Sequence, residues 1–107
     1  MTIYHARNFD YNTELYLEAL QKIAQLDYAN TVRSCHCCER VSERGINLKK
    51  ISPAKVLRSE VFEIKAEGER IISIGIKVLY NRKKSACLII GYNSKEPMIV
   101  TAWLNKE

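Results

Sequence analysis

The sequence lacks a long hydrophobic run, an internal repeat and a low-complexity segment. Because a helix needs about 20 apolar residues to cross a bilayer, the 107-residue chain is not expected to contact a membrane. Residues 1–7 also lack the apolar stretch of a secretion signal. We therefore expect a cytoplasmic protein that folds as a single domain over residues 1–107.

Acidic side chains are scarce in the middle of the chain. The whole sequence has 17 Lys and Arg against 12 Asp and Glu, a net charge of +5. Residues 31–84 contain thirteen of the cations and only six of the acids, whereas residues 1–30 have a net charge of −2. Such asymmetry favours a polyanion or an acidic protein as the partner, but a solvated basic surface has the same composition.

Three of the four cysteines crowd into Cys35, Cys37 and Cys38. Neighbouring cysteines on one helix point in different directions and do not bridge easily, so free thiols in a reducing compartment are expected. The Cys35-x-x-Cys38 spacing leaves two alternatives open. One is a redox pair at a helix N-terminus. The other is half of a zinc site, for which Cys87, His5 and nearby acids would supply the remaining ligands. Apolar packing is the default role of Cys37 and Cys38, so we predict no metal and no cofactor.

Two helices are predicted in the first half of the chain. Apolar residues recur at helical spacing from about residue 12 to residue 26, and residues 35–44 form a second helix. Ser34 is a suitable N-cap for the second helix, and Gly45 is suited to closing its last turn. A short turn is expected over residues 47–51.

After Pro53 the spacing of apolar residues changes to alternation, which predicts strands. Four strands are expected, over residues 61–66, 70–80, 85–92 and 98–104. In the second of them, the predicted buried face consists of Ile72, Ile74, Ile76 and Val78. Short connections indicate an antiparallel meander. We therefore predict an α+β fold, with two N-terminal helices from residues 1–52 packed on a C-terminal antiparallel sheet of about four strands from residues 53–107.

The second predicted helix carries the most distinctive chemistry. His36, Arg40 and Arg44 recur at positions i, i+4 and i+8, which puts one imidazole and two guanidiniums along one face. An imidazole titrates near neutral pH, and a guanidinium binds phosphate through a fork of donors. Such a face suits an RNA phosphate or a proton-transfer step, although a solvated charged helix gives the same pattern.

Part of this helix resembles a family signature. The segment His36-Cys37-x-Glu39-Arg40-x-x-Glu43-Arg44-Gly45-Ile46 is similar to the pattern H-A-x-E-R-x-x-E-R-G-I of a small bacterial family, catalogued as domain of unknown function 4258. Val100-Thr101-Ala102-Trp103 resembles the last strand of that family, so the resemblance covers about residues 34–104. One departure is Cys37, where the family usually has alanine.

The family is grouped with small toxin ribonucleases, which include barnase, colicin endonucleases and RelE-like toxins (the BECR fold). The resemblance therefore implies RNA cleavage without a metal ion, on a sheet flanked by N-terminal helices. It also implies a toxin-antitoxin or toxin-immunity system, in which an acidic antitoxin or immunity protein covers the basic face. The implied substrate is mRNA or tRNA, on or off the ribosome.

These observations select the candidate site residues. Metal-independent cleavage needs a base, an acid, and cations that stabilise the charge developing on phosphate. For catalysis we select His36, Arg40, Thr101 and Tyr80. For RNA binding we select Arg44, Lys77, Arg82, Lys83, Lys84 and Trp103. Simpler roles stay open for some of them: sheet packing for the two aromatic residues, a solvated turn for residues 82–84, and pairing at the end of the helix for Arg44.

Three functions fit the sequence. The first is a toxin-type endoribonuclease. The second is a non-catalytic module that binds nucleic acid or protein with the same basic face. The third is a zinc- or redox-responsive regulator that uses Cys35 and Cys38. A titrating group near phosphate separates the first two, because a binder needs only cations.

Overall fold

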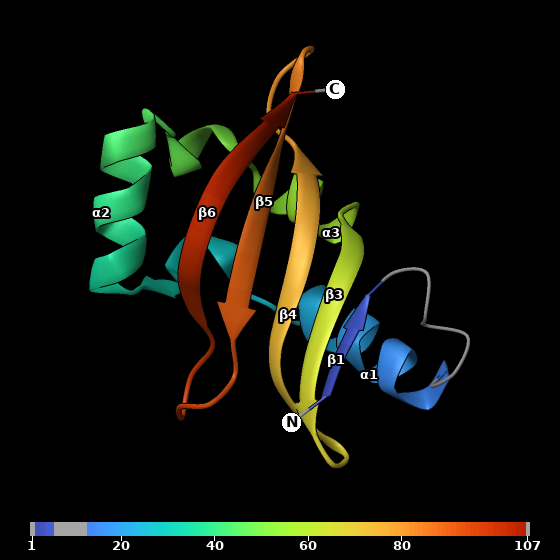
Figure 1. Cartoon of the computed structure of the whole chain (residues 1–107). Coiled ribbons are helices and arrows are strands. Elements are labelled where there is room, and N and C mark those ends of the chain that lie inside the picture. Colours follow the sequence, from blue (N-terminus) through green and yellow to red (C-terminus); the bar gives the residue numbers. More distant parts are fainter. Residues whose placement is uncertain (1, 6–12, 107) are drawn as a thin grey trace.

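The computed structural model describes residues 2–5 and 13–106, which form an α+β structure (Figure 1). The helices are α1 (Thr13–Ala24), α2 (Cys35–Arg44) and α3 (Pro53–Leu57), and two 3-10 turns are η2 (Tyr28–Asn30) and η3 (Leu48–Lys50). The strands are β1 (Thr2–His5), β2 (Val32–Arg33), β3 (Glu60–Glu67), β4 (Arg70–Leu79), β5 (Lys84–Gly91) and β6 (Met98–Lys106). The described strands form one sheet in the order β1-β3-β4-β5-β6-β2.

The α+β class is confirmed, but the predicted two helices on four antiparallel strands are wrong in detail. The described residues contain three helices and six strands, and β2 pairs with β6 in parallel, which makes the sheet mixed. β1 and β2 are too short, at four and two residues, for a repeating pattern to appear in the sequence. Both strands precede residue 52, so the part of the chain predicted to be mainly helical also supplies the two outer strands of the sheet.

The third helix starts at Pro53, where the sequence analysis expected helical structure to have ended. Proline suits the first turn of a helix, because the N–H that it lacks has no partner inside the helix there. Ser52 completes the start as N-cap, with its side chain accepting the N–H of Lys55. The predicted turn at residues 47–51 is confirmed as η3. The residue at which the first helix was predicted to begin, Asn12, lies outside the described residues.

Strands β3 to β6 form the predicted antiparallel meander. One face of this sheet packs against α1 and α3, which lie behind the strands in Figure 1. Its largest fully buried side chains are Ile64, Ile74, Ile76, Leu88, Ile90 and Ile99. Each contributes about 1.5–3 kcal/mol by leaving water, so this face is the main core of the protein.

A bulge changes the predicted pattern in β4. Lys65 pairs with Ser73 and Ala66 with Ile71, so Ile72 is an extra residue in the ladder. An extra residue shifts the alternation of side chains, and Ile71 is buried in the core in place of the predicted Ile72.

Among the described residues, no helix combines the length and the apolar character needed to cross a membrane.

Candidate functional site

Helix α2 covers one edge of the sheet. Ser34 is the predicted N-cap: its Oγ accepts the N–H of Cys37 at 3.0 Å and donates to the carbonyl oxygen of Val100 at 2.9 Å. Near the other end of the helix, Arg44 Nη1 donates to the carbonyl oxygen of Ala102 at 2.6 Å. Carbonyls two residues apart point to the same side of a strand. Side chains of α2 and its cap therefore satisfy the outer edge of β6, and they fix the helix beside Thr101 and Trp103.

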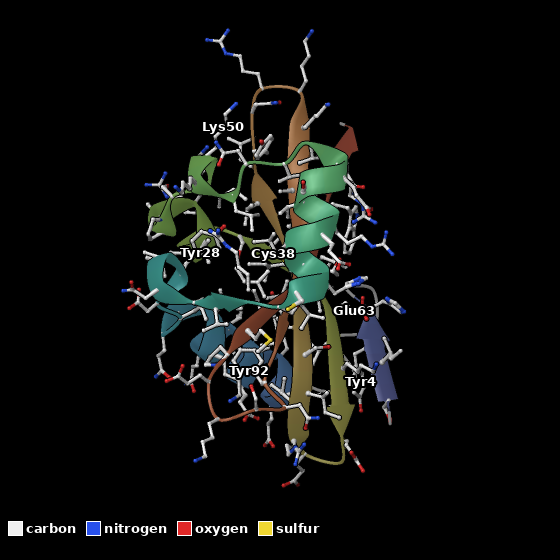
Figure 2. All side chains as sticks on the ribbon, turned by 90° about the vertical axis from the view of Figure 1, so that its left-hand side faces the viewer. Tyr4, Tyr28, Cys38, Lys50, Glu63 and Tyr92 are labelled. Atoms are coloured by element: carbon white, nitrogen blue, oxygen red, sulfur yellow. The ribbon has the colours of Figure 1, made fainter. Side chains whose placement is uncertain are left out.

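His36 and Arg40 lie on one flank of α2. Cys37 is fully buried, and Cys38, labelled in Figure 2, is exposed on the first turn of the helix. Because each helical residue turns by about 100°, His36 and Arg40 are nearly opposite to Cys38. His36 is exposed, and Arg40 Nη1 donates to Glu43 Oε2 at 3.0 Å. An exposed ion pair of this kind is worth about 0–1 kcal/mol, so a phosphate could displace the carboxylate.

The second face of the sheet has none of the described helices over it (Figure 1). We call it the open face, and define it by Phe62, Ser73, Lys77, Ile89, Thr101 and Trp103, which are partly exposed on the four central strands. Two acidic residues of β3 also lie on this face: Glu60, opposite Lys77, and Glu63, opposite Gly75. Lys77 lies opposite Cys87 in the register, and Cys87 lies opposite Trp103. Thr101 lies two residues before Trp103 on the same face of β6, opposite Ile89. The structure thus brings three of the selected residues, Lys77, Thr101 and Trp103, onto one surface.

An aromatic pair lies on the open face. The ring of Phe62 meets Trp103 edge to face, with centroids 6.0 Å apart and an interplanar angle of 79°. Phe62 is the extra residue of a bulge in β3, and its ring lies over Gly75. A Cβ at position 75 would be 2.8 Å from Phe62 Cζ, so only glycine leaves room for the ring. Phe62 was not among the residues selected from the sequence, although a lone glycine inside a strand is a signal of such close approach.

Cys87 also belongs to this side of the sheet, but it is closed off from solvent. It is 2% exposed, and Asn105 Nδ2 donates to its Sγ at 3.1 Å. Burial raises the pKa of the Cys87 thiol, and the nearby Lys77 offsets part of that rise. Cys87 therefore acts as a small packing residue beneath the exposed side chains.

Tyr80 does not join the other residues selected for catalysis. It follows Val78 by two positions and is buried at 8% exposure, on the side of the sheet that carries the core. Its hydroxyl accepts the N–H of Asn47 at 2.9 Å, and Lys50 Nζ lies 5.8 Å from its ring centroid. Tyr80 thus joins η3 to the end of β4. Thr101 is on the opposite face of the sheet, so the structure does not bring these two residues together.

The three selected cations of the β4–β5 turn lie at one end of the sheet. Asn81 Oδ1 accepts the backbone N–H groups of both Lys83 and Lys84 at 2.9 Å, which shapes the turn. The side chains of Arg82 and Lys83 are exposed, and Lys84 is partly so. They form a basic region beyond the end of the open face.

All four cysteines are free thiols, with Cys35 and Cys38 exposed and the other two buried. Within residues 2–5 and 13–106, no three His, Cys, Asp or Glu side chains are grouped so that they could hold a metal ion. Cys87 is bonded to Asn105 on the open face and does not meet Cys35 or Cys38. The zinc alternative therefore gains no support from the geometry.

A hollow of about 640 Å³ lies elsewhere, where the end of α1 and the β5–β6 turn form part of its wall. None of the residues selected from the sequence lines it. Small-molecule substrates are usually bound in concave pockets. Most of the selected residues lie on a strand surface, on helix α2 and on a turn instead, an arrangement that suits a polymer better.

No family model, no curated protein and no solved structure matches this chain.

Proposed function

We propose that this protein binds single-stranded RNA on its open face and cleaves it without a metal ion, as a toxin-type endoribonuclease. One observation carries the proposal. Lys77, Thr101 and Trp103 share the open face of the sheet, and α2 holds the exposed His36 and the partly exposed Arg40 along the adjoining edge. In this proposal Trp103 stacks on a nucleobase, Lys77 and Arg40 bind phosphate, and His36 accepts the proton.

The aromatic pair supports the choice of single-stranded RNA. Unpaired bases stack on exposed aromatic rings, and each such contact contributes about 1–3 kcal/mol. Trp103 is partly exposed, and Phe62 supports it edge-on. Lys77, in line with Trp103 across the strands, would bind a neighbouring phosphate. A base-paired strand does not present its bases to a flat sheet in this way.

The proposed chemistry is an attack by the 2′-oxygen of ribose on the adjacent phosphorus. His36 accepts the proton of the 2′-OH as the O2′–P bond forms. The P–O5′ bond breaks, and the leaving O5′ takes a proton from a water molecule. The products are a 2′,3′-cyclic phosphate and a 5′-OH. The phosphate would replace Glu43 as the partner of Arg40, so that Arg40 binds one phosphate oxygen. The Thr101 hydroxyl would donate a hydrogen bond to another.

An acidic antitoxin or immunity protein is the partner that we propose. Residues 31–84 carry the basic excess of the chain, and this part includes α2 and the β4–β5 turn. A protein with acidic side chains facing these elements would compete with RNA for the same surface.

The decisive experiment is induced expression in a bacterial host of wild type, His36→Ala and His5→Ala, with growth and total RNA integrity followed together. The chain has two histidines, and His5 lies on β1, four strands away from β6. We expect growth arrest and RNA cleavage with wild type and with His5→Ala, and neither with His36→Ala. Unchanged cleavage by His36→Ala would remove the catalytic part of the proposal.

A second candidate is a module that binds RNA without cleaving it. Two of the four residues selected for catalysis have other partners: Arg40 is paired with Glu43, and Tyr80 accepts from Asn47. Binding of a 2′-O-methyl RNA, which cannot be cleaved, separates the two candidates. A pure binder would tolerate His36→Ala in every assay, whereas Arg40→Ala would weaken its binding.

A further inference from the structure

Five cations gather at one end of the molecule, and only three of them are among the residues selected from the sequence. We call this cluster the basic end and define it as Lys49 and Lys50 of η3 with Arg82, Lys83 and Lys84 of the β4–β5 turn. Lys50, labelled in Figure 2, lies near the top of the molecule, where Figure 1 shows the β4–β5 turn. Two segments far apart in the sequence therefore present one charged surface.

Tyr80 holds the two segments together. Its hydroxyl accepts the Asn47 N–H at 2.9 Å, and its ring lies 5.8 Å from Lys50 Nζ. On the other side, the backbone N–H of Tyr80 donates to the carbonyl oxygen of Lys84 at 3.1 Å. A buried tyrosine thus fixes the base of η3 against the base of the turn, while the long cationic side chains extend outward.

The two chain segments that form the basic end supply no acidic side chain. Residues 44–59 and residues 80–95, which include both segments, contain no Asp or Glu. Lys49, Lys50, Arg82 and Lys83 are exposed. Clustered cations without acids repel one another, so binding an anion relieves this repulsion.

The basic end is displaced from the open face along the strand. Arg82 follows Lys77 by five residues, which is at most about 16 Å at the rise of an extended strand, and β4 itself ends at Leu79. A stacked strand with a rise of about 3.4 Å per nucleotide would cover that distance with about five nucleotides, so RNA of this length could contact the open face and the basic end together.

We propose that the basic end is a second RNA contact, which holds the backbone of the strand beyond the nucleotides on the open face. The inference rests on the proposed function and specifies its substrate class: RNA long enough to reach both surfaces. Ammonium and guanidinium groups at phosphate carry no sequence information. The basic end therefore adds affinity, while any base preference comes from the aromatic pair.

The test is a binding titration of 2′-O-methyl RNAs of three and twelve nucleotides at several salt concentrations. The variants are Lys49→Ala/Lys50→Ala and Arg82→Ala/Lys83→Ala, the second in case loss of the Lys50–Tyr80 contact affects folding. The control is Lys95→Ala, an exposed lysine of the β5–β6 turn at the opposite end of the sheet (Figure 1). Far-UV circular dichroism checks that each variant is folded.

For the twelve-nucleotide RNA we expect each double variant to lower the slope of log K against log salt by about 1.4, since each lost contact removes about 0.7. The trinucleotide should bind wild type and both double variants alike, and Lys95→Ala should match wild type with both RNAs. A wild-type slope in both folded double variants would overturn the inference.

A Trp103→Ala variant, tested in parallel, distinguishes failure of the proposed function from failure of the inference about the basic end. Wild-type affinity of this variant for the trinucleotide, together with intact RNA in cells that express wild type, would refute binding and cleavage on the open face. The slopes of the double variants would then still decide the basic end. Absence of binding to either RNA by wild type would overturn both proposals.

Discussion

The four thiols of this protein occupy two kinds of environment. Cys37 is 0% exposed and Cys87 is 2% exposed, whereas Cys35 and Cys38 are exposed on the first turn of α2. Burial raises the pKa of the Cys37 and Cys87 thiols. Only the thiolate is a good nucleophile. At a given pH a smaller fraction of these two buried cysteines is therefore in the thiolate form, and a reagent also reaches them less easily.

We predict that iodoacetamide at about pH 8, just below the ordinary pKa of a cysteine, modifies Cys35 and Cys38 quickly and the two buried thiols slowly. Intact mass should rise by two additions first, and peptide mapping should place them. Protein unfolded in guanidinium chloride is the control and should gain four. Modification of Cys37 as fast as Cys35 would show that α2 leaves the sheet readily.

Single positions on the strands show what the sequence could predict about the site. The alternation of side chains along β4 predicted that Lys77 points to the face of the sheet away from Ile76 and Val78. The structure confirms this, because Lys77 lies on the open face and the other two are buried in the core. The same alternation puts Tyr80 with Val78, so it could have excluded Tyr80 from the site. Phe62 was harder to find, because the bulge that aims it over Gly75 depends on how β3 and β4 pair.

At the scale of elements, α2 depends on one serine at its start. Ser34 Oγ accepts the N–H of Cys37 and donates to the carbonyl oxygen of Val100, so one hydroxyl both caps the helix and attaches it to β6. At its other end the helix closes with Gly45 at φ 66°, a left-handed conformation that glycine adopts without strain.

We predict that Ser34→Ala lowers the free energy of unfolding by about 1–3 kcal/mol, as the sum of a lost N-cap and a lost hydrogen bond. Ser42→Ala is the matched control, because Ser42 is exposed on the same helix. It should be neutral or slightly stabilising, since alanine favours helix. Urea denaturation followed by circular dichroism measures both. Equal stability of the two variants would contradict the double role of Ser34.

The element boundaries also show where sequence patterns stop being informative. Both caps of α2 were predicted from residue type, because Ser and Gly are selected by local backbone geometry. The start of α3 at Pro53 is equally local and could have been predicted. β1 and β2 could not, because their pairing partners β3 and β6 are distant in the sequence and only the folded sheet brings them together.

At the scale of the whole molecule, the two edges of the sheet are covered by different elements. β2 and α2 border β6, and Ser34 and Arg44 bond to its outward carbonyls. The opposite edge is β1, which pairs with β3 from Thr2↔Ala66 to His5↔Glu63. An unfinished strand edge exposes unpaired backbone groups to solvent. β1 therefore supports β3, and with it the bulge that carries Phe62.

We predict that deleting residues 1–5 lowers the free energy of unfolding by about 2–4 kcal/mol, because backbone hydrogen bonds to β3 are lost at about 1 kcal/mol each. Tyr4 adds to the loss, since its partly buried side chain packs against the core. Ile3→Ser is the control: Ile3 is 47% exposed, so this variant keeps the backbone pairing and loses little burial. Urea denaturation of both variants gives the comparison. If the deletion is no more costly than Ile3→Ser, β3 does not need β1, and the open face should keep its binding properties without it.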